Sequence, residues 1–353
     1  MNRRLVFSIA KVAASFSLAL ALMPTASAAV FSSTANGNYG TPATWGTPSG
    51  EPDPDNGAVD TVTFNNAVIV NVVTQMTGDS VTFAAGGSLI ISNNNSTTFA
   101  VSSMNFTAAD STIGVGRATS GTTANHKLGD NNTTSAFGGG RTLSVINGNS
   151  VTGGAAGTLI INGLSTLSGN QTFNIGTAAS AVNVLTLAGA ITELAGGSSI
   201  TKLGAGSLVL NGVNNYTGNT TISEGSFTLS DNAALAFKIG ANGVNNSVGG
   251  AGTASFDGDF TFDLSTAATG LGNSWNIVNV AALSETFTDN FTVTGFTANG
   301  AALWDLSTGG RTYQFSETTG NLTVVAVPET STGALALGVI TSFTLIRRRH
   351  RQG

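Results

Sequence analysis

The side chains of this chain that could carry chemistry are few and scattered. Its 353 residues include two histidines, His126 and His350, and no cysteine. Thiol chemistry and cysteine-ligated zinc or iron–sulfur sites are therefore excluded. A Ser-His-Asp triad or a cluster of histidine metal ligands would need more than His126, because His350 lies in a basic stretch at the C-terminus. His126 stands among Gly, Thr and Asn residues, so we expect it in a solvent-exposed loop.

Three aspartates with short spacing, Asp257, Asp259 and Asp263, could offer carboxylate oxygens to a cation. They alternate with phenylalanines along residues 256–264, which is the pattern of the solvent face of one strand. The preceding Gly249-Gly-Ala-Gly partly matches a calcium-binding nonapeptide, but Ala254 stands at the coordinating aspartate position. We therefore expect neither a metal nor a cofactor.

Enzymes that cleave polysaccharides depend on grouped carboxylates, and those built on β-helices group them on one sheet. Here the acids are spread over the chain, and the basic residues show no paired spacing with them. We therefore expect no enzymatic activity. The alternative is a carbohydrate-binding or polysaccharide-degrading protein with a cleft, for which the best candidates are Asp257, Asp259, Trp275 and Trp304.

The charge of the chain argues against nucleic-acid binding. Seven of the 13 Lys and Arg residues lie in the terminal 28 and 27 residues, whereas only Glu329 of the 18 acids does. The body between these ends is therefore strongly acidic and lacks the clustered cations that contact phosphates.

The elements that would position any site are strands. Glycine accounts for 46 residues and proline for only 6, and the apolar residues come in short clusters bounded by Gly and Asn, which is typical of strands separated by turns. A sustained helical period is absent from the body. The predicted strands include residues 59–64, 68–73, 88–92, 158–162, 182–187, 207–211 and 226–230.

Some of these clusters recur in sequence. Gly157-Thr-Leu-Ile-Ile-Asn-Gly163 matches Gly206-Ser-Leu-Val-Leu-Asn-Gly212, and residues 87–92 are a shorter version. The spacing of Leu89, Leu159 and Leu208 suggests a period of about 23–24 residues, and periods in the twenties are typical of solenoids. We expect an all-β, right-handed parallel β-helix over residues 29–253, with an irregular β-sandwich as the alternative.

One segment, residues 201–230, carries a longer pattern. Its glycines, leucines and aromatic residue follow K-x-G-x-G-x-L-x-L, N-x-Y-x-G-x-T-x-[IV] and G-x-L-x-[LV], with Phe227 where leucine is usual. The segment resembles the autotransporter-associated β-strand repeat. The resemblance implies consecutive strands in β-helical coils, with a structural, stacking role for Tyr216 at a turn. The matching residues include Lys202, Gly204, Gly206, Leu208, Tyr216, Gly218 and Gly225.

Both ends of this solenoid need covers, because open sheet edges pair with other chains. Trp45 follows a turn-rich segment and is expected to cap the N-terminal end. Residues 254–325 contain Trp275 and Trp304, and we expect them to form a separate C-terminal capping module of antiparallel strands.

The first 28 residues read as a signal peptide. Arg3 and Arg4 precede an apolar stretch, and Ala26-Ser27-Ala28 fits the small-x-small cleavage pattern. We expect export through the Sec translocon with cleavage after Ala28.

The last 27 residues, 327–353, have three parts in order. Val327-Pro328-Glu329 is followed by an apolar run over residues 332–346 and then by Arg347-Arg348-Arg349. The run is shorter than the about 20 residues that span a bilayer, and the arginines favour the cytoplasmic side. The order resembles the PEP-CTERM sorting tail, with Thr330 in place of that family's second proline. The resemblance implies transient insertion of residues 332–346 as a transmembrane helix in the inner membrane and processing by an exosortase. An unprocessed anchor is the alternative.

Together these features predict a non-enzymatic protein of the cell surface or extracellular matrix of a Gram-negative bacterium. The expected partners are an exosortase-type enzyme, the Sec translocon, the inner membrane and exopolysaccharide of a biofilm. A surface-displayed β-helix that binds or degrades polysaccharide is the alternative.

Overall fold

The computed structural model of the chain describes residues 30–38, 42–45, 60–70, 80–84, 87–92, 96–116, 125–147, 157–176, 183–283, 286–300 and 302–327. The predicted signal peptide, with Ala26 and Ala28, lies outside the described residues. So does the sorting tail from Pro328 onward, including Glu329, the apolar run and Arg347, Arg348 and Arg349. None of the described residues forms a helix with the length and hydropathy needed to cross a bilayer.

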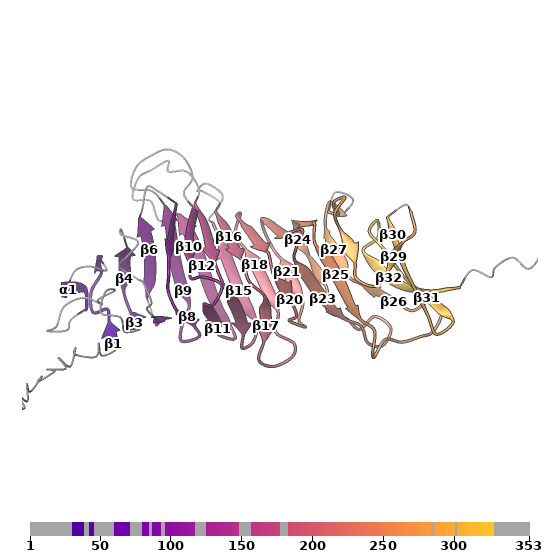
Figure 1. Ribbon diagram of the computed structural model, residues 1–353, viewed down its shortest axis with the longest axis horizontal. Coiled ribbons are helices and arrows are strands. Elements are labelled where there is room, and N and C mark those ends of the chain that lie inside the picture. Colours follow the sequence, from indigo (N-terminus) through magenta and orange to yellow (C-terminus); the bar gives the residue numbers. More distant parts are fainter. Residues whose placement is uncertain are drawn as a thin grey trace, which may run out of the picture.

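The chain winds into an elongated parallel β-helix whose coils contribute strands to three faces, which confirms the predicted fold class (Figure 1). The first face contains β1 (Val30–Ser32), β3 (Thr61–Phe64), β5 (Ser80–Phe83), β8 (Ser103–Phe106), β11 (Thr134–Phe137), β14 (Leu164–Leu167) and β17 (Ile191–Glu193). A hydrogen bond from Asn215 N to Ile191 O (2.9 Å) continues this face. Its later strands are β20 (Val213–Asn214), β23 (Ala234–Lys238), β25 (Asp259–Asp263) and β28 (Thr292–Val293).

The other two faces belong to one continuous sheet. The second face contains β2 (Gly37–Asn38), β4 (Ala67–Val70), β6 (Ser88–Ser92), β9 (Ser111–Gly116), β12 (Arg141–Asn147), β15 (Gln171–Ile175), β18 (Ile200–Leu203), β21 (Thr220–Ile222) and β27 (Val278–Ala281). The third contains β7 (Thr97–Phe99), β10 (Asn125–Leu128), β13 (Thr158–Ile161), β16 (Val184–Leu187), β19 (Ser207–Leu210) and β22 (Ser226–Leu229). They join at β24 (Val248–Phe256), which pairs with β21 at its start and with β22 at its end.

Alternation of small outward and apolar inward side chains explains why these segments form strands. In β3, β5 and β8 every second residue is buried, and parallel pairing places equivalent residues of successive coils directly above one another. The predicted strand clusters coincide with β3, β4, β6, β13, β16, β19 and β22.

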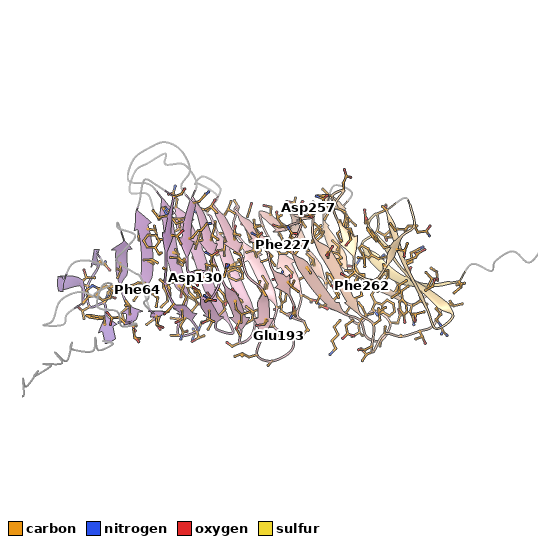
Figure 2. All side chains as sticks on the ribbon, viewed as in Figure 1. Phe64, Asp130, Glu193, Phe227, Asp257 and Phe262 are labelled. Carbon is orange, nitrogen blue, oxygen red and sulfur yellow. The ribbon has the colours of Figure 1, made fainter. Side chains whose placement is uncertain are left out.

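Phenylalanines form a continuous internal column on the first face. The ring centroids of Phe64 and Phe83 lie 5.3 Å apart, those of Phe83 and Phe106 4.8 Å apart, and those of Phe106 and Phe137 5.0 Å apart. All four side chains are fully or almost fully buried, and Figure 2 labels Phe64 near the N-terminal end of the rod. Ring contacts of this kind add stability beyond that of buried area alone.

The coils differ in length, which corrects the predicted period. Residues bonded across neighbouring coils are 29 apart at Thr97 and His126, 33 apart at Gly129 and Asn162, but only 19 apart at Ser207 and Ser226. Leu159 and Leu208 do share one column, through Leu185.

Leu89 lies elsewhere, in β6 on the second face. Its apparent repeat was wrong, because local strand composition recurs on different faces.

At the N-terminal end, the one-turn helix α1 (Pro42–Trp45) places Trp45 against the first coils. The indole is almost fully buried, with its ring centroid 6.3 Å from that of Phe31 and 6.2 Å from that of Phe64. The side chain thus begins the aromatic column, in agreement with the predicted cap.

The C-terminal end is closed by an antiparallel sheet in the order β26 (Ser274–Asn276), β32 (Asn321–Ala326), β31 (Arg311–Ser316), β30 (Leu303–Thr308) and β29 (Thr297–Ala298). Its Phe315 ring meets the last coils, with its centroid 5.8 Å from that of Phe260. Within the cap sheet, the ring centroids of Trp275 and Tyr313 lie 6.2 Å apart. The predicted boundary after residue 253 falls inside β24. Parallel pairing continues through β25, β27 and β28, so solenoid and cap share residues 254–293.

Candidate functional site

The segment that resembles a known repeat supplies five consecutive strands, β18 to β22, on all three faces. Its coils are short: Ser207 and Ser226 close one over 19 residues, as Thr61 and Ser80 do near the N-terminal end. Such short coils leave little room at the corners, so the corner residues are constrained.

Lys202 lies at the corner between the second and third faces, with its side chain inside the solenoid and fully buried. Its Nζ donates to Leu203 O (2.8 Å), Gly204 O (2.7 Å) and Glu224 O (3.3 Å), the last in the next coil. Burial lowers the pKa of Lys202 to about 8, while the charge of Glu224 acts in the opposite direction. Three carbonyl acceptors match the three N–H bonds of an ammonium, so the group is charged at neutral pH and fixes two coils together.

Three of the predicted motif glycines, Gly204, Gly206 and Gly225, surround this corner, and Gly218 lies at the corner between the first and second faces. Gly204 and Gly225 have positive φ angles of 78° and 67°, a conformation that side chains rarely adopt. A Cβ at Gly206 would lie 2.4 Å from Asn183 O, and one at Gly218 would lie 2.4 Å from Ser198 O. All four positions therefore require glycine for backbone packing.

Leu208 and Tyr216 also serve the fold. Leu208 is fully buried in the column that runs from Leu185 to Phe227. Tyr216 is fully buried as well, and its hydroxyl lies 2.6 Å from Thr220 Oγ1. Burial raises the pKa of this phenol. The structural role expected for Tyr216 agrees with these contacts.

The residues proposed for a carbohydrate cleft do not form one. Trp275 is fully buried, and its Nε1 donates to Ala241 O (2.8 Å), so no face of its ring can stack on a sugar. Asp257 and Asp259 lie on the outside, where they accept hydrogen bonds from Thr288 and Thr292. Figure 2 labels Asp257 at the edge of the rod. Trp304 Nε1 donates to Glu317 Oε1 in the cap.

The aspartates follow the strand pattern that the sequence predicts. In β25, Phe260 and Phe262 point inward, whereas Asp259 and Asp263 point outward. Across the described ranges, no group of three or more His, Asp and Glu side chains could hold a metal ion.

His126 was wrongly placed in an exposed loop. It lies in β10 and is fully buried, with Nδ1 2.9 Å from Thr97 Oγ1. Its column continues with Leu159 in the next coil. A polar residue at an inward position gave no signal in the sequence, because the flanking residues have turn-like composition.

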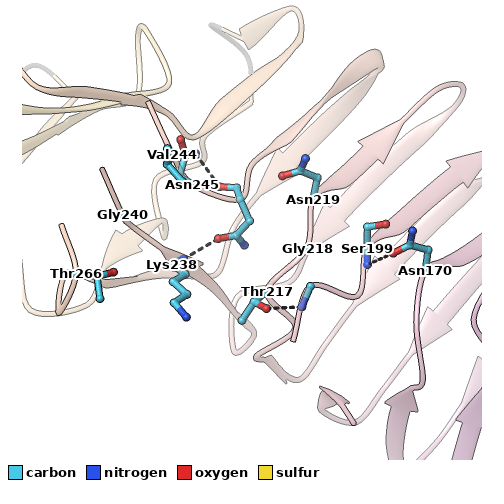
Figure 3. Close-up of a pocket in the computed structure, with 12 residues that line it drawn as sticks. Asn170, Ser199, Thr217, Gly218, Asn219, Lys238, Gly240, Val244, Asn245 and Thr266 are labelled. Atoms are coloured by element: carbon cyan, nitrogen blue, oxygen red, sulfur yellow. Dashed lines mark hydrogen bonds between the residues drawn. The ribbon is translucent and has the colours of Figure 1, made fainter. Parts of the chain in front are cut away.

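A solvent-open groove of about 560 Å³ lies beside the repeat segment, at the corner between the first and second faces (Figure 3). It is lined by turn residues from successive coils and by the loop before β24, including Asn170, Gly197, Ser199, Thr217, Gly218, Asn219, Lys238, Gly240, Val244, Asn245 and Thr266. Among the described residues that line it, none is acidic or aromatic.

One wall of the groove is a column of alternating Asn and Ser. Asn170 Oδ1 accepts the N–H of Ser199 (3.1 Å), and Asn219 Oδ1 accepts the N–H of Ser247 (2.9 Å). Backbone hydrogen bonds link Ile200 to Asn219 in the same column. Because each amide oxygen is bound to the next coil, the Nδ2 amino group is the outward end of Asn170 and of Asn219 (Figure 3).

The floor of the groove is held by Glu193. Its Oε2 accepts the N–H of Ser198 (2.8 Å), and its Oε1 accepts the N–H and the hydroxyl of Thr217 (3.1 and 2.6 Å). Thr217 Oγ1 in turn accepts the N–H of Gly197 (2.8 Å). The two turns therefore keep a fixed position relative to each other.

The opposite wall is the loop between β23 and β24. Asn246 holds its start, because its Oδ1 accepts the N–H of Lys238 (2.7 Å) and its Nδ2 donates to Ala236 O (3.0 Å). The side chains of Lys238 and Val244 are exposed. Asp263 faces Lys238 across the strand pair; hydrogen bonds from Ser265 lower the pKa of Asp263, and Lys238 adds to this effect.

Sequence analysis did not identify the groove. Its residues come from several coils, and their alignment depends on coil lengths that follow no fixed period. The available signal was an asparagine directly before two strands of the second face, Asn170 before β15 and Asn219 before β21.

One segment of the chain matches the model of a known family. Residues 200–229 match the model of the passenger-associated transport repeat, the segment in which sequence analysis found the autotransporter-associated pattern. Repeats of this kind are found in exported proteins of the autotransporter type, which suggests a surface or extracellular location. The comparison with curated proteins gave no match.

Proposed function

We propose that this chain is a non-enzymatic structural protein of the surface or extracellular matrix of a Gram-negative bacterium, associated with exopolysaccharide. The observation that carries the proposal is the passenger-associated repeat at residues 200–229, set in a long, cysteine-free β-solenoid. Repeat proteins of this shape offer an extended surface rather than one enclosed site.

The chemistry of the body supports a structural role. The polar side chains best suited to catalysis have structural positions instead. Lys202 binds carbonyl oxygens, and His126 lies in an internal column. Asp257 and Asp259 accept hydrogen bonds from neighbouring threonine hydroxyls. We therefore propose that the protein has no catalytic activity, cofactor or nucleic-acid partner.

Delivery is assigned to the two ends of the sequence. The signal peptide directs the chain to the Sec translocon, with cleavage after Ala28. The tail from Val327 to Arg349 then holds the chain briefly in the inner membrane, where an exosortase-type enzyme processes it. The order proline–glutamate, apolar run and arginines supports this route.

Deletion of residues 327–353 in the native host tests the route. We expect the truncated protein to be absent from the surface fraction, because it lacks the segment that the exosortase-type enzyme processes. A matched variant, Arg347, Arg348 and Arg349 each changed to Ser, keeps the length but removes the cytoplasmic charge. If both variants reach the surface with the size of the wild-type protein, the sorting proposal is wrong.

The lack of catalysis has its own test. Purified protein is incubated with a panel of polysaccharides, and new reducing ends and unsaturated products are measured. We expect neither above a buffer control. Any turnover that disappears on changing Asp257 or Asp259 to Asn would favour the polysaccharide-degrading alternative instead.

A further inference from the structure

We propose that the groove beside the repeat binds a polysaccharide whose repeating unit carries a carboxylate, of the uronic acid class. This inference deepens the proposed function, on which it rests, by assigning a place and a ligand chemistry to the association with exopolysaccharide. It starts from two hydrogen-bond donors of the groove, the amino groups of Asn170 and Asn219.

The donors are built into the column of alternating Asn and Ser. The amide oxygens of Asn170 and Asn219 are committed to the N–H groups of Ser199 and Ser247, so their amino groups face the groove (Figure 3). The Thr217 hydroxyl is already bound within the protein, since it donates to Glu193 and accepts from the N–H of Gly197. A ligand that binds these two amino groups must supply acceptor oxygens. Asn245 on the opposite wall donates its Nδ2 to Asn246 O and Asn276 O, so its Oδ1 can accept from a sugar hydroxyl.

The spacing of the donors suits a polymer. Asn170 and Asn219 belong to coils separated by one intervening coil, that of Ser199. Neighbouring parallel strands lie about 4.8 Å apart, so the two amino groups repeat at roughly 10 Å along the rod. This distance is close to the length of a disaccharide unit in an extended polysaccharide chain. A chain laid along the groove would thus present the same oxygen to both asparagines.

The opposite wall adds charge and an apolar contact. Lys238 is exposed and is the one cation among the described lining residues. An ammonium forms its strongest hydrogen bonds with ionised oxygens, which favours a carboxylate over a neutral hydroxyl. Val244, 60% exposed, offers a small apolar surface to the C–H groups of a sugar ring.

Two other features shape the expected affinity. Asp263 lies beside Lys238 on the neighbouring strand and weakens its attraction for anions. The acidic body also repels a polyanion at long range, although this repulsion is screened beyond about 8 Å at physiological ionic strength. A single groove therefore binds weakly, and a long polymer that crosses many displayed copies binds by avidity.

Asparagine-to-aspartate substitution gives a sharp test. Asn170→Asp and Asn219→Asp keep the oxygen that accepts the N–H of the next coil, but they replace the amino donor with an anionic oxygen. The probe is a galacturonic acid oligomer of defined length, with its methyl ester as the uncharged counterpart. Binding to the full chain, purified in mild detergent, is measured by calorimetry or by NMR of the oligomer.

We expect the wild-type protein to bind the acid form in preference to the ester. Each aspartate variant and Lys238→Met should weaken binding about tenfold, the loss of one charge-assisted hydrogen bond, without a change in the unfolding midpoint. Two controls match them. Asn36→Asp changes an asparagine that holds Ala67 N–H at the same corner of the first coil, and Lys127→Met removes an exposed lysine on the third face.

Unchanged binding in Asn219→Asp and Lys238→Met overturns the groove as the site. Equal binding of the acid and the ester overturns the carboxylate. These outcomes are distinct from failure of the proposed function, which shows as absence of the protein from the surface and matrix fractions even when the groove binds the oligomer.

Discussion

The aromatic half of the solenoid and the repeat segment build the same β-helix by different means. From β3 to β11 the coils are joined by a column of phenylalanine rings inside the first face, with centroids 4.8–5.3 Å apart. From β18 to β22 they are joined at the corners, by glycines with close backbone contacts and by the ammonium of Lys202.

The difference explains why a family pattern is visible in only one stretch. Large rings stack whatever the length of the connecting loop, so the aromatic coils tolerate 33 residues between bonded positions as well as 19. In the repeat segment, coils of 19 and 20 residues are held by close backbone contacts at their corners. Those contacts need particular residues at particular spacing, and such a pattern can be recognised in sequence.

The largest effect should follow from breaking the aromatic column. Phe106→Ala removes a ring that contacts Phe83 and Phe137, and a cavity at a buried phenylalanine costs about 3–5 kcal/mol in free energy of unfolding. Leu164→Ala is the control, because this residue is 40% exposed on the same face and should cost under about 0.5 kcal/mol. Urea unfolding measures both; similar losses for the two would contradict a column that holds the coils.

A backbone change in the repeat should come next. Gly225→Ala places a Cβ 2.3 Å from Gly206 O at a φ of 67°, and we expect a loss of at least about 2 kcal/mol in unfolding free energy. Gly197→Ala has a φ of 92° but nothing within 4 Å, so it carries only the strain, about 1–2 kcal/mol. The difference between the two variants isolates the close packing of coils. Equal losses would mean that strain alone selects glycine.

Removing the ammonium tests the corner contact. Lys202→Met keeps the length and most of the apolar contact but leaves carbonyl oxygens of two coils without their donor, at a cost of about 1–3 kcal/mol at pH 7. Lys127→Met, on the outer surface, is the matched control. A Lys202→Met protein as stable as the wild type would show that water or rearrangement satisfies these carbonyls.

The same residue predicts a pH dependence. The pKa of Lys202 is lowered to about 8 in the folded state and is near 10.5 when unfolded, so between these values the unfolded chain holds the additional proton. Stability from this group therefore rises with pH across that window and is constant below it. Unfolding midpoints of wild type and Lys202→Met at pH 7 and pH 9.5 give the comparison, because other titrations cancel in the difference. A gap between the two proteins that narrows at pH 9.5 would contradict the sign.

The smallest effect should come from a hydroxyl. Tyr216→Phe removes the hydrogen bond with Thr220 and should cost about 1 kcal/mol, a fall of about 2 °C in Tm. Calorimetry detects such a shift. A loss of unfolding free energy well above this value would contradict a contribution limited to one hydrogen bond.

The fold class followed from the sequence because strand signals are local. Short apolar clusters between Gly and Asn located seven strands within one to three residues, and the repeat pattern located the tight coils. Coil length and register could not follow in the same way. They depend on loops whose length varies freely once internal stacking fixes the strands, and this placed Leu89 on the wrong face.

The site residues divide along the same line. The motif positions, such as Gly204 and Tyr216, were predicted to be structural and are so. His126 was misjudged because burial depends on which side of a strand enters the core, and it does not stand in a clear alternating pattern. Trp275 is buried in the cap where it was expected, which excludes it from the alternative carbohydrate cleft. The groove arises only when corners of several coils align, which a linear pattern does not record.

The double pairing of β24 has a mechanical consequence. This strand continues from the second face to the third through a register irregularity between Gly250 and Thr253, and it pairs with β21, β22 and β27. A tether pulled along the rod would have to break all these pairings together, whereas in the coils before it each strand pairs on one face only. Under tension the N-terminal coils should therefore unfold first, and β24 and the C-terminal cap should unfold last.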